Sequence, residues 1–262
     1  MKEFATPAPI MLRVRIPAGT VHVVAEERTT ATVDLRPRDE TDQEAWKLVE
    51  QARISLDGDT LVVEVRDRHR WFQTSELALR VGLPSDSRVN LTSASAGVHC
   101  AGRLASLHAK SASGDVDAEE VTGDASVITA SGDVMVQHVR SRLRVKSASG
   151  DIEVVRSDGE VDVKVASGDV VVRASGGAVR AHTASGDVRV ESADTGSLAV
   201  QTVSGDVRIG VRAGSAVWLD LTSRSGNTTS ELPIESEPAI ADCSLNINVR
   251  TVSGDISVVR AA

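Results

Sequence analysis

One stretch of the chain shows the motif that decides the fold: SGDIEVVRSDGEVDVKVASGDV, residues 149–170. Ser-Gly-Asp stands at its start and again 18 residues later, and apolar residues alternate with polar ones between the two copies. Alternation with a period of two and many β-branched residues is typical of half-buried strands. Glycine accommodates a positive φ at a turn, and aspartate can bond the backbone two residues on. Each 18-residue unit therefore predicts two short strands and two turns.

The motif recurs through most of the chain. The glycines of its Ser-Gly-Asp copies are Gly114, Gly132, Gly150, Gly168, Gly186, Gly205 and Gly254, and variants lie at Gly97 and Gly226. Self-similarity at a fixed period indicates coils that complete one another's core by stacking. We therefore expect an all-β fold, a parallel β-solenoid with two short strands in each coil of about 18 residues.

Charged positions provide a test of this stacking, because a parallel solenoid with this period places residue i beside residue i+18. Opposite charges on neighbouring strands stabilise a sheet. The pairs of opposite charge in this register are Arg142 with Glu160, Arg144 with Asp162, Asp162 with Arg180, and Arg173 with Glu191. Lys146 beside Lys164 is a pair of like charge and an exception. The pattern favours parallel stacking, and a meander of hairpins is the alternative.

The rest of the chain reads as the two ends of the same stack. We predict a single elongated β-repeat domain over residues 1–262. Its three parts are N-terminal strands with a capping helix (1–92), regular repeats (93–210), and irregular C-terminal coils (211–262) that contain an insertion at 227–242.

The N-terminal part carries signals of its own. Residues 10–35 read as strands, with Pro17-Ala18-Gly19 as a turn. Thr41 to Glu44 is a capping-box signature, which predicts a helix over 42–52 whose apolar face closes one end of the stack. Asp57-Gly58-Asp59 between two apolar runs predicts a hairpin.

These motifs together resemble a known family. The repeated (T/A)-x-SGD-(V/I)-x-V, with G-x-(L/V)-x-V between copies, covers residues 93–258, and RIPAGTVHV (15–23) and LPSDSRVNL (83–91) resemble the family's usual opening. The chain is similar to the bacterial β-strand-repeat proteins known as DUF4097, some of which carry the label "putative adhesin". The resemblance implies a β-repeat fold and supplies no catalytic residues.

Composition limits the function classes. The formal net charge is −8, which argues against nucleic-acid binding, because that needs a clustered positive field. No apolar run approaches the length of a membrane span, and the first residues lack a stretch of signal-peptide length. Two cysteines are too few for a disulfide framework. We therefore expect a cytoplasmic protein without a transmembrane segment.

The aspartates of the repeated motif form the first candidate site. Stacked in register, they would line one edge of the solenoid: Asp115, Asp133, Asp151, Asp169, Asp187 and Asp206. Hard divalent cations prefer oxygen ligands, so the row is a candidate cation edge. The alternative, which we favour, is that each carboxylate accepts turn amides, because turn chemistry explains serine, glycine and aspartate together.

A basic and aromatic segment at 66–72 forms the second candidate site. Its residues of interest are Arg66, Arg68, His69, Arg70, Trp71 and Phe72. Such a segment can bind an anionic polymer, a membrane surface or a protein partner. The structural alternative is an exposed loop whose aromatic residues fold over the end of the stack.

Three functions follow from these patterns. The first is a non-enzymatic structural or interaction protein, adhesin-like or a scaffold, with an unidentified protein or surface partner and ends that could join into a homo-oligomer. The second is a stress- or ligand-sensing accessory protein that binds an anionic partner through 66–72. The third is an enzyme of unknown class, which needs an acid, base or nucleophile gathered from separate coils. Because spacing assembles no such set and the six histidines show no metal-ligand spacing, we predict no enzyme, no catalytic residue, no resident metal and no cofactor.

Overall fold

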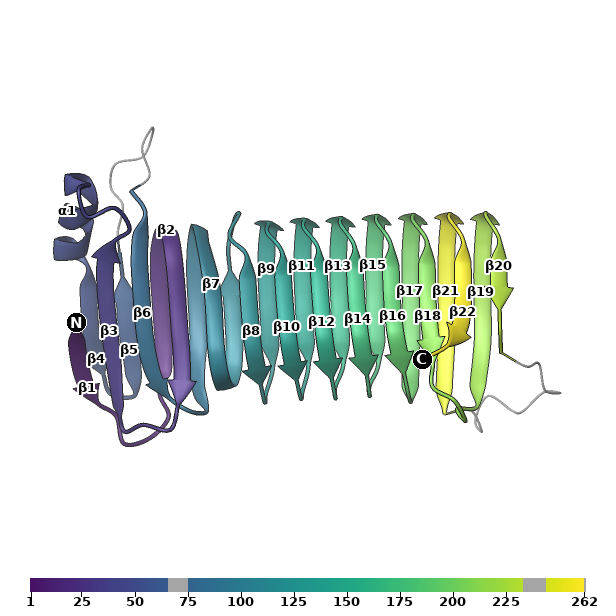
Figure 1. Cartoon of the computed structure of the whole chain (residues 1–262), viewed down its shortest axis with the longest axis horizontal. Helices are drawn as coiled ribbons and strands as arrows, with labels where there is room; N and C mark the ends of the chain where they lie inside the picture. The colour runs from purple at the N-terminus through teal and green to yellow at the C-terminus, as the bar shows by residue number, and fades with distance from the viewer. Residues whose placement is uncertain (66–74, 233–243, 262) are drawn as a thin grey trace. The chain divides into compact units, whose positions relative to one another are not determined.

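The computed structural model of the chain describes residues 1–65, 75–232 and 244–261. They form two compact units, Met1–Asp133 and Val134–Ala262, which we describe one at a time. Both units consist of strands that wind into coils, and α1 (Gln43–Gln51) in unit 1 is the one helix among the described residues (Figure 1). The predicted all-β, parallel β-solenoid with a short helix near the N-terminus is confirmed. One continuous domain over 1–262 stays a prediction.

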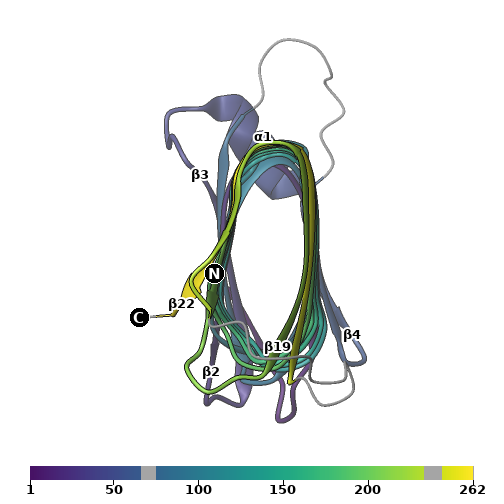
Figure 2. The ribbon, with the colours of Figure 1, turned by 90° about the vertical axis from the view of Figure 1, so that its right-hand side faces the viewer.

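Unit 2 contains the regular coils. Its strands are β10 (Val134–Val139), β11 (Leu143–Ser149), β12 (Ile152–Ser157), β13 (Val161–Ser167), β14 (Val170–Ser175), β15 (Val179–Ser185), β16 (Val188–Ala193), β17 (Gly196–Ser204), β18 (Val207–Val211), β19 (Val217–Ser225), β20 (Thr228–Ser230), β21 (Leu245–Ser253) and β22 (Ile256–Arg260). Each coil contributes one strand to each of two opposite faces, which together outline a flattened oval (Figure 2).

The register of these coils is the predicted one. Val145 of β11 lies beside Val163 of β13, and Val163 lies beside Ala181 of β15, all in parallel strands. These side chains point into the oval and are fully buried. Burying one valine contributes about 1.5–3 kcal/mol, and each coil buries several, so a coil gains its core only when its neighbours are present.

The C-terminal coils depart from the order of the sequence. β21 pairs in parallel with β17 on one side and with β19 on the other (Figure 1). On the opposite face, β22 lies between β18 and β20. The last coil of the sequence, Leu245–Arg260, is thus inserted between two earlier ones. The alternation of Val217, Leu219 and Leu221 suggests a direct continuation of the regular coils, but this strand lies one coil further out, beyond β21.

The apolar content of the two coils explains this order. The inserted coil has inward apolar residues on both faces, and all five are fully buried: Leu245, Ile247, Val249, Ile256 and Val258. The coil of β19 and β20 has apolar inward residues on one face only, because Thr228 and Ser230 occupy the other. A coil with one polar inner face can lie at an end of the stack, where one side needs no apolar partner. Strand β20 also falls inside the range 227–242 that the sequence analysis assigned to an insertion.

Unit 1 begins with less regular strands. They are β1 (Lys2–Ala5), β2 (Met11–Glu26), β3 (Thr30–Pro37), β4 (Arg53–Asp57), β5 (Thr60–Glu64), β6 (Leu77–Pro84), β7 (Ser87–Lys110), β8 (Val116–Val121) and β9 (Ala125–Ser131). Strand β2 is continuous through the predicted turn at Pro17–Gly19, where it bends from one face of the coil to the other. Gly19 has φ +115°, and a Cβ there would lie 1.9 Å from the Leu77 carbonyl oxygen. The bend therefore requires glycine.

Antiparallel strands lie at the start of unit 1. β1 pairs with β3 and β3 with β6 in antiparallel fashion, whereas β6, β5 and β7 all run parallel to β2. The predicted hairpin is confirmed, because β4 and β5 pair antiparallel around Gly58. The parallel solenoid thus describes the repeats, and hairpin pairing adds strands to them at this end.

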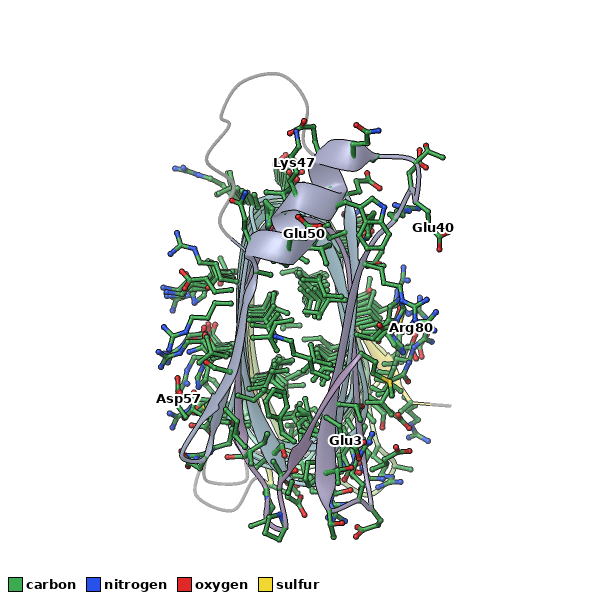
Figure 3. The ribbon with its side chains drawn as sticks, turned by 90° about the vertical axis from the view of Figure 1, so that its left-hand side faces the viewer. Glu3, Glu40, Lys47, Glu50, Asp57 and Arg80 are labelled. Atoms are coloured by element: carbon green, nitrogen blue, oxygen red, sulfur yellow. The ribbon has the colours of Figure 1, made fainter. Side chains whose placement is uncertain are left out.

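Helix α1 lies at the same end of unit 1, beside β3, across a narrow side of the oval (Figure 3). Its N-cap is Asp42, whose carboxylate accepts the backbone N–H of Glu44 at 2.9 Å and of Ala45 at 3.1 Å. The sequence analysis took Thr41 as the cap residue, which was wrong by one position. The Thr41 hydroxyl instead donates to Asp39 at 2.7 Å. Ala45 is the buried residue of the helix, and Leu48 and Val49 are half-buried.

Candidate functional site

The aspartates of the repeated motif form a ladder of backbone contacts. In unit 2, the Asp169 N–H donates to the Asp151 carboxylate at 2.8 Å, and the same bond is repeated from coil to coil. The further bonds run from Asp187 to Asp169, Asp206 to Asp187, Asp255 to Asp206 and Asn227 to Asp255, each at 2.8 Å. In unit 1, the Asp133 N–H donates to Asp115 at 2.9 Å. Each carboxylate named as an acceptor therefore holds the turn of the next coil.

This arrangement leaves the candidate cation edge without structural support. One oxygen of each accepting carboxylate already receives a backbone N–H, and the carboxylates follow one another singly along the edge. Over residues 1–65, 75–232 and 244–261, no group of three or more His, Cys, Asp or Glu side chains is close enough to hold a metal ion. The cation row stays a hypothesis, and the turn interpretation accounts for each hydrogen bond of this ladder.

The second candidate site lies outside the described residues. Arg66, Arg68, His69, Arg70, Trp71 and Phe72 all fall in the segment 66–74, between the two described ranges 1–65 and 75–232. Binding through this segment stays a prediction.

Single titratable groups elsewhere have structural partners. His99 lies 2.9 Å from the Asp117 carboxylate, and His138 lies 2.8 Å from that of Asp158. The hydrogen bond from His138, with smaller contributions from Arg156, lowers the pKa of Asp158. Burial raises the pKa of the Cys100 thiol to about 12, so this cysteine is a core residue rather than a nucleophile.

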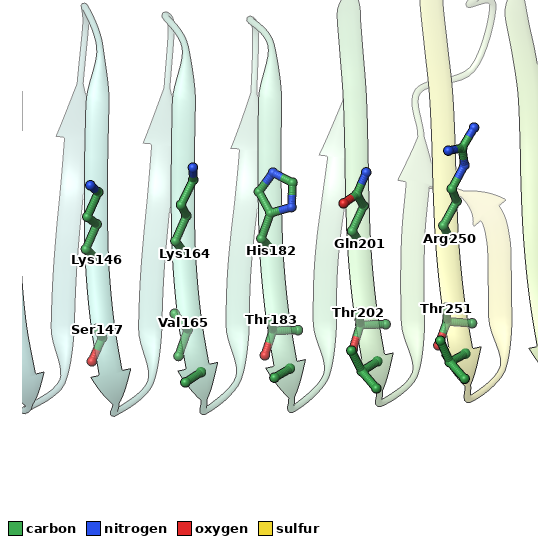
Figure 4. Close-up of a pocket in the computed structure, with 14 residues that line it drawn as sticks. Lys146, Ser147, Lys164, Val165, His182, Thr183, Gln201, Thr202, Arg250 and Thr251 are labelled. Atoms are coloured by element: carbon green, nitrogen blue, oxygen red, sulfur yellow. The ribbon is translucent and has the colours of Figure 1, made fainter.

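A shallow groove of about 790 Å³ lies on the outer face of unit 2 (Figure 4). It crosses five neighbouring strands, β11, β13, β15, β17 and β21, near the ends that carry the Ser-Gly-Asp turns. Because the strands are in register, each one contributes the equivalent positions of its coil. The groove is therefore lined by columns of residues that run across the strands.

The first column is a row of polar side chains that we call the basic ladder: Lys146, Lys164, His182, Gln201 and Arg250. Each member is the register partner of the next. The side chains leave neighbouring strands side by side (Figure 4). Parallel strands lie about 4.8 Å apart, so the ladder is about 19 Å long.

Charge compensation differs along the basic ladder. Neither Lys146 nor Lys164 lies within 4.0 Å of a carboxylate among the described residues. Asp162, on the same face, instead forms an ion pair with Arg144 at 3.3 Å. At the other end, Arg250 lies 3.8 Å from the Asp220 carboxylate. The two lysines thus form an uncompensated pair of like charge. Like charges directly opposite one another destabilise a sheet, and a bound anion would relieve their repulsion.

The second outward column of the groove is apolar and is called here the apolar row. It consists of Ala166, Ala184, Val203 and Val252. Val203 is 54% exposed and Val252 47% exposed, and both belong to the few large apolar side chains in the described residues that solvent reaches to this extent. The groove therefore combines unpaired cations with an apolar strip.

Sequence analysis found part of this site without recognising it. The like-charge pair of Lys146 and Lys164 stood out as the exception among the pairs of opposite charge. Arg250 could not be added, since it lies 49 residues after Gln201 in the sequence and becomes its neighbour only through the inserted coil. A signal for the apolar row was present as alanine or valine directly before each Ser-Gly-Asp of β13, β15, β17 and β21.

The family resemblance is confirmed. The family model described as Toastrack DUF4097 matches residues 13–259, and the chain belongs to this family, whose fold is the β-solenoid found here. Among curated proteins, no relative matches the chain. No helix in the described part of the chain is both long and apolar enough to cross a bilayer.

Several solved bacterial proteins have the same fold. A "putative adhesin" from Parabacteroides distasonis shares 11% identity at a TM-score of 0.55, over 98% of this chain and 95% of that one. A "putative adhesin" from Parabacteroides merdae shares 10% at 0.53, over 98% and 94%. A "putative lipid binding protein" from P. distasonis shares 14% at 0.51, over 98% and 95%. At these identities the likeness concerns the fold.

Proposed function

We propose that this protein is a non-enzymatic interaction protein that binds an anionic partner in the groove of unit 2. The observation that carries the proposal is the pair of neighbouring lysines, Lys146 and Lys164, which lie beside an open groove and have no ion pair with a carboxylate of the described residues. On the same face, Arg142 and Arg144 lie beside carboxylates, Arg142 3.4 Å from Glu160 and Arg144 3.3 Å from Asp162. Arg189 and Arg208 are register partners of like charge on the opposite face, and Lys146 and Lys164 differ from them by lying beside the groove, where a binding role explains them.

The proposal agrees with several other features. The described residues gather no metal-binding cluster, and the one buried thiol described is protonated at neutral pH. The solved structures with this fold are named for adhesion or lipid binding. An adhesin-like or scaffold role is a finer version of the same function. The bacterial source and cytoplasmic location expected from the sequence stay predictions.

Two matched double variants test the proposal. Lys146→Gln with Lys164→Gln removes the unpaired cations, and Arg142→Gln with Arg144→Gln removes two paired cations from the same face. Both change the net charge equally. Binding of fluorescent poly-glutamate and of dodecyl phosphate is measured by titration of the full chain at low salt.

We expect at least one of these anionic probes to bind, and the lysine variant to weaken it about tenfold or more while the arginine variant does not. Binding should also fall as salt rises, because exposed charges are screened. The lysine variant should keep or slightly raise the melting temperature, since it removes a like-charge pair. Failure of both probes to bind, or equal weakening by both variants, contradicts the proposal.

A further inference from the structure

The groove differs from one end to the other in charge. The uncompensated cations are at the β11–β13 end, whereas the middle of the basic ladder holds His182 and Gln201. The cation at the far end, Arg250, shares the carboxylate of Asp220 with the amide of Asn248, which donates to it at 2.6 Å. A linear polymer with evenly spaced negative charges would meet an unpaired cation of the groove lining at one end only. The charge distribution instead suits a ligand with a single anionic end.

The apolar row supplies the other half of the argument. From Ala166 it runs across β15 and β17 to β21, away from the lysine pair, and it ends with the exposed Val203 and Val252. The side chains grow from alanine to valine in that direction. Exposed apolar strips beside polar rows mark binding surfaces for partly apolar ligands. An alkyl chain lying along this strip would remove apolar surface of both partners from water.

We propose that the groove binds a single-chain anionic amphiphile, with its head group at Lys146 and Lys164 and its alkyl chain along the apolar row towards Val252. This inference rests on the proposed function and names the class of ligand. Two lysines on neighbouring strands, which lie about 4.8 Å apart, can both donate to one carboxylate or phosphate group. The apolar row crosses three strand spacings, about 14 Å from Ala166 to Val252, and β19 lies beyond β21.

The first experiment is a chain-length series with the full chain. Alkyl carboxylates and alkyl phosphates of about 8, 12 and 16 carbons are titrated below their critical micelle concentrations. Because half-burying a methylene corresponds to about a twofold gain in affinity, we expect roughly 16-fold tighter binding from 8 to 12 carbons. The gain from 12 to 16 carbons should be smaller, because the longer chain extends beyond Val252. The two head groups distinguish a fatty-acid source from a lipid-phosphate source, and an alkyl trimethylammonium of equal length is expected not to bind.

The second experiment uses matched variants of exposed apolar residues in unit 2. Val203→Asp places a charge in the apolar row, and Met135→Asp places one on β10, on the opposite face of the same unit. We expect Val203→Asp to abolish the gain with chain length while leaving the affinity of the shortest probe within about twofold. Met135→Asp should leave the whole series unchanged, which controls for net charge and folding.

The outcomes separate this inference from the proposed function. Lysine-dependent binding of poly-glutamate with no gain along the alkyl series overturns the amphiphile and leaves the anion-binding function intact. A gain with chain length that is equal for the trimethylammonium probe, or that Val203→Asp does not alter, also overturns it. Absence of any lysine-dependent binding overturns both. A series that strengthens with chain length, requires an anionic head and is flattened by Val203→Asp supports the inference.

Discussion

The regular coils between β10 and β18 and the two coils at the end of unit 2 use the same motif to different effect. In the regular coils, spatial order follows sequence order, and each strand pairs with the one 18 or 19 residues later. At the end of the unit, β17 pairs with β21, 49 residues later, and β19 lies beyond it. The repeat motif therefore determines how a coil stacks but not which coil it stacks on.

What decides the neighbour is the number of inward apolar residues. The inserted coil has apolar inward residues on both faces of the solenoid, so other coils can pack on both of its sides. The coil of β19 and β20 has apolar inward residues on one face only. Burying it between two other coils would place Thr228 and Ser230 against apolar neighbours on both sides. The burial of polar groups is therefore smallest when the less apolar coil lies at the end of the stack. The first three predictions below test this difference between the inserted coil and its neighbours, and the fourth concerns the regular coils.

The strongest test is a cross-link that depends on which strands are adjacent. Gln201 and Arg250 are register partners, and Arg250 and Thr222 are too, whereas Gln201 and Thr222 are separated by a strand. Neighbouring parallel strands bring Cα atoms within disulfide distance, and strands about 9.6 Å apart do not. In a Cys243→Ser background, we expect near-complete oxidation of Gln201→Cys with Arg250→Cys.

The control pair is Gln201→Cys with Thr222→Cys, which we expect to stay reduced under the same mild oxidant. Mass spectrometry of proteolytic fragments reads out both pairs. If the control pair cross-links and the first does not, β19 follows β17 directly and the inserted coil is wrong.

The second test compares the cores of the two coils. Ile247 of the inserted coil is fully buried, and Leu219 of the end coil is half-buried. We expect Ile247→Ala to lower the free energy of unfolding by about 2–5 kcal/mol, because the cavity is enclosed on all sides. Leu219→Ala should cost less than half as much. Urea unfolding of both variants measures the difference, and equal costs would mean that the two coils are equally covered.

These residues also show how far the sequence predicts the fold. The period of 18, the alternation and the charged pairs all act between adjacent coils, so they predicted the solenoid, its register and the half-buried strands. These patterns do not predict which coils distant in sequence become neighbours, since Leu245–Val258 would fit against any coil of the stack. The N-cap at Asp42 was missed by one residue because threonine and aspartate are both good caps at adjacent positions.

The candidate site was predictable to a smaller extent. Turn chemistry predicted that the aspartates accept turn amides, and the structure shows the amide to be that of the equivalent residue in the neighbouring coil rather than one two residues on. The groove depends on a column that includes Arg250, and that column exists only after the inserted coil is in place. The lysine pair was visible in the sequence as a violation of charge pairing, which shows that exceptions to a structural pattern deserve a functional test.

The third test uses the glycine of the inserted coil. Gly254 has φ +141°, and a Cβ there would lie 2.1 Å from the carbonyl oxygen of Gly205, its neighbour in the regular coils. Gly214, before the end coil, has φ +90° with open space around the Cβ position. We expect Gly254→Ala to cost about 2 kcal/mol or more through strain and contact together, and Gly214→Ala about 1 kcal/mol through strain alone. Thermal unfolding of both variants measures this, and a larger effect at Gly214 would contradict the packing of Gly254 on Gly205.

The smallest expected effect concerns acid and belongs to the regular coils. The hydrogen bond from His138 holds the pKa of Asp158 below its ordinary value of 3.8. A carboxyl group with a lowered pKa in the folded state stabilises the protein above its unfolded pKa, and this contribution disappears as the pH falls through the folded pKa. Between about pH 5 and pH 2.5, Asp158→Asn should therefore lose less stability than the unchanged protein.

His138→Gln removes the main cause of the lowered pKa and should flatten the same slope, and the double variant should add nothing further. Because the Asp158 side chain is 40% exposed, the change is small and calls for urea titrations at matched ionic strength. Slopes that stay at the unchanged value in both single variants would show that this pair contributes nothing to the acid sensitivity of the regular coils.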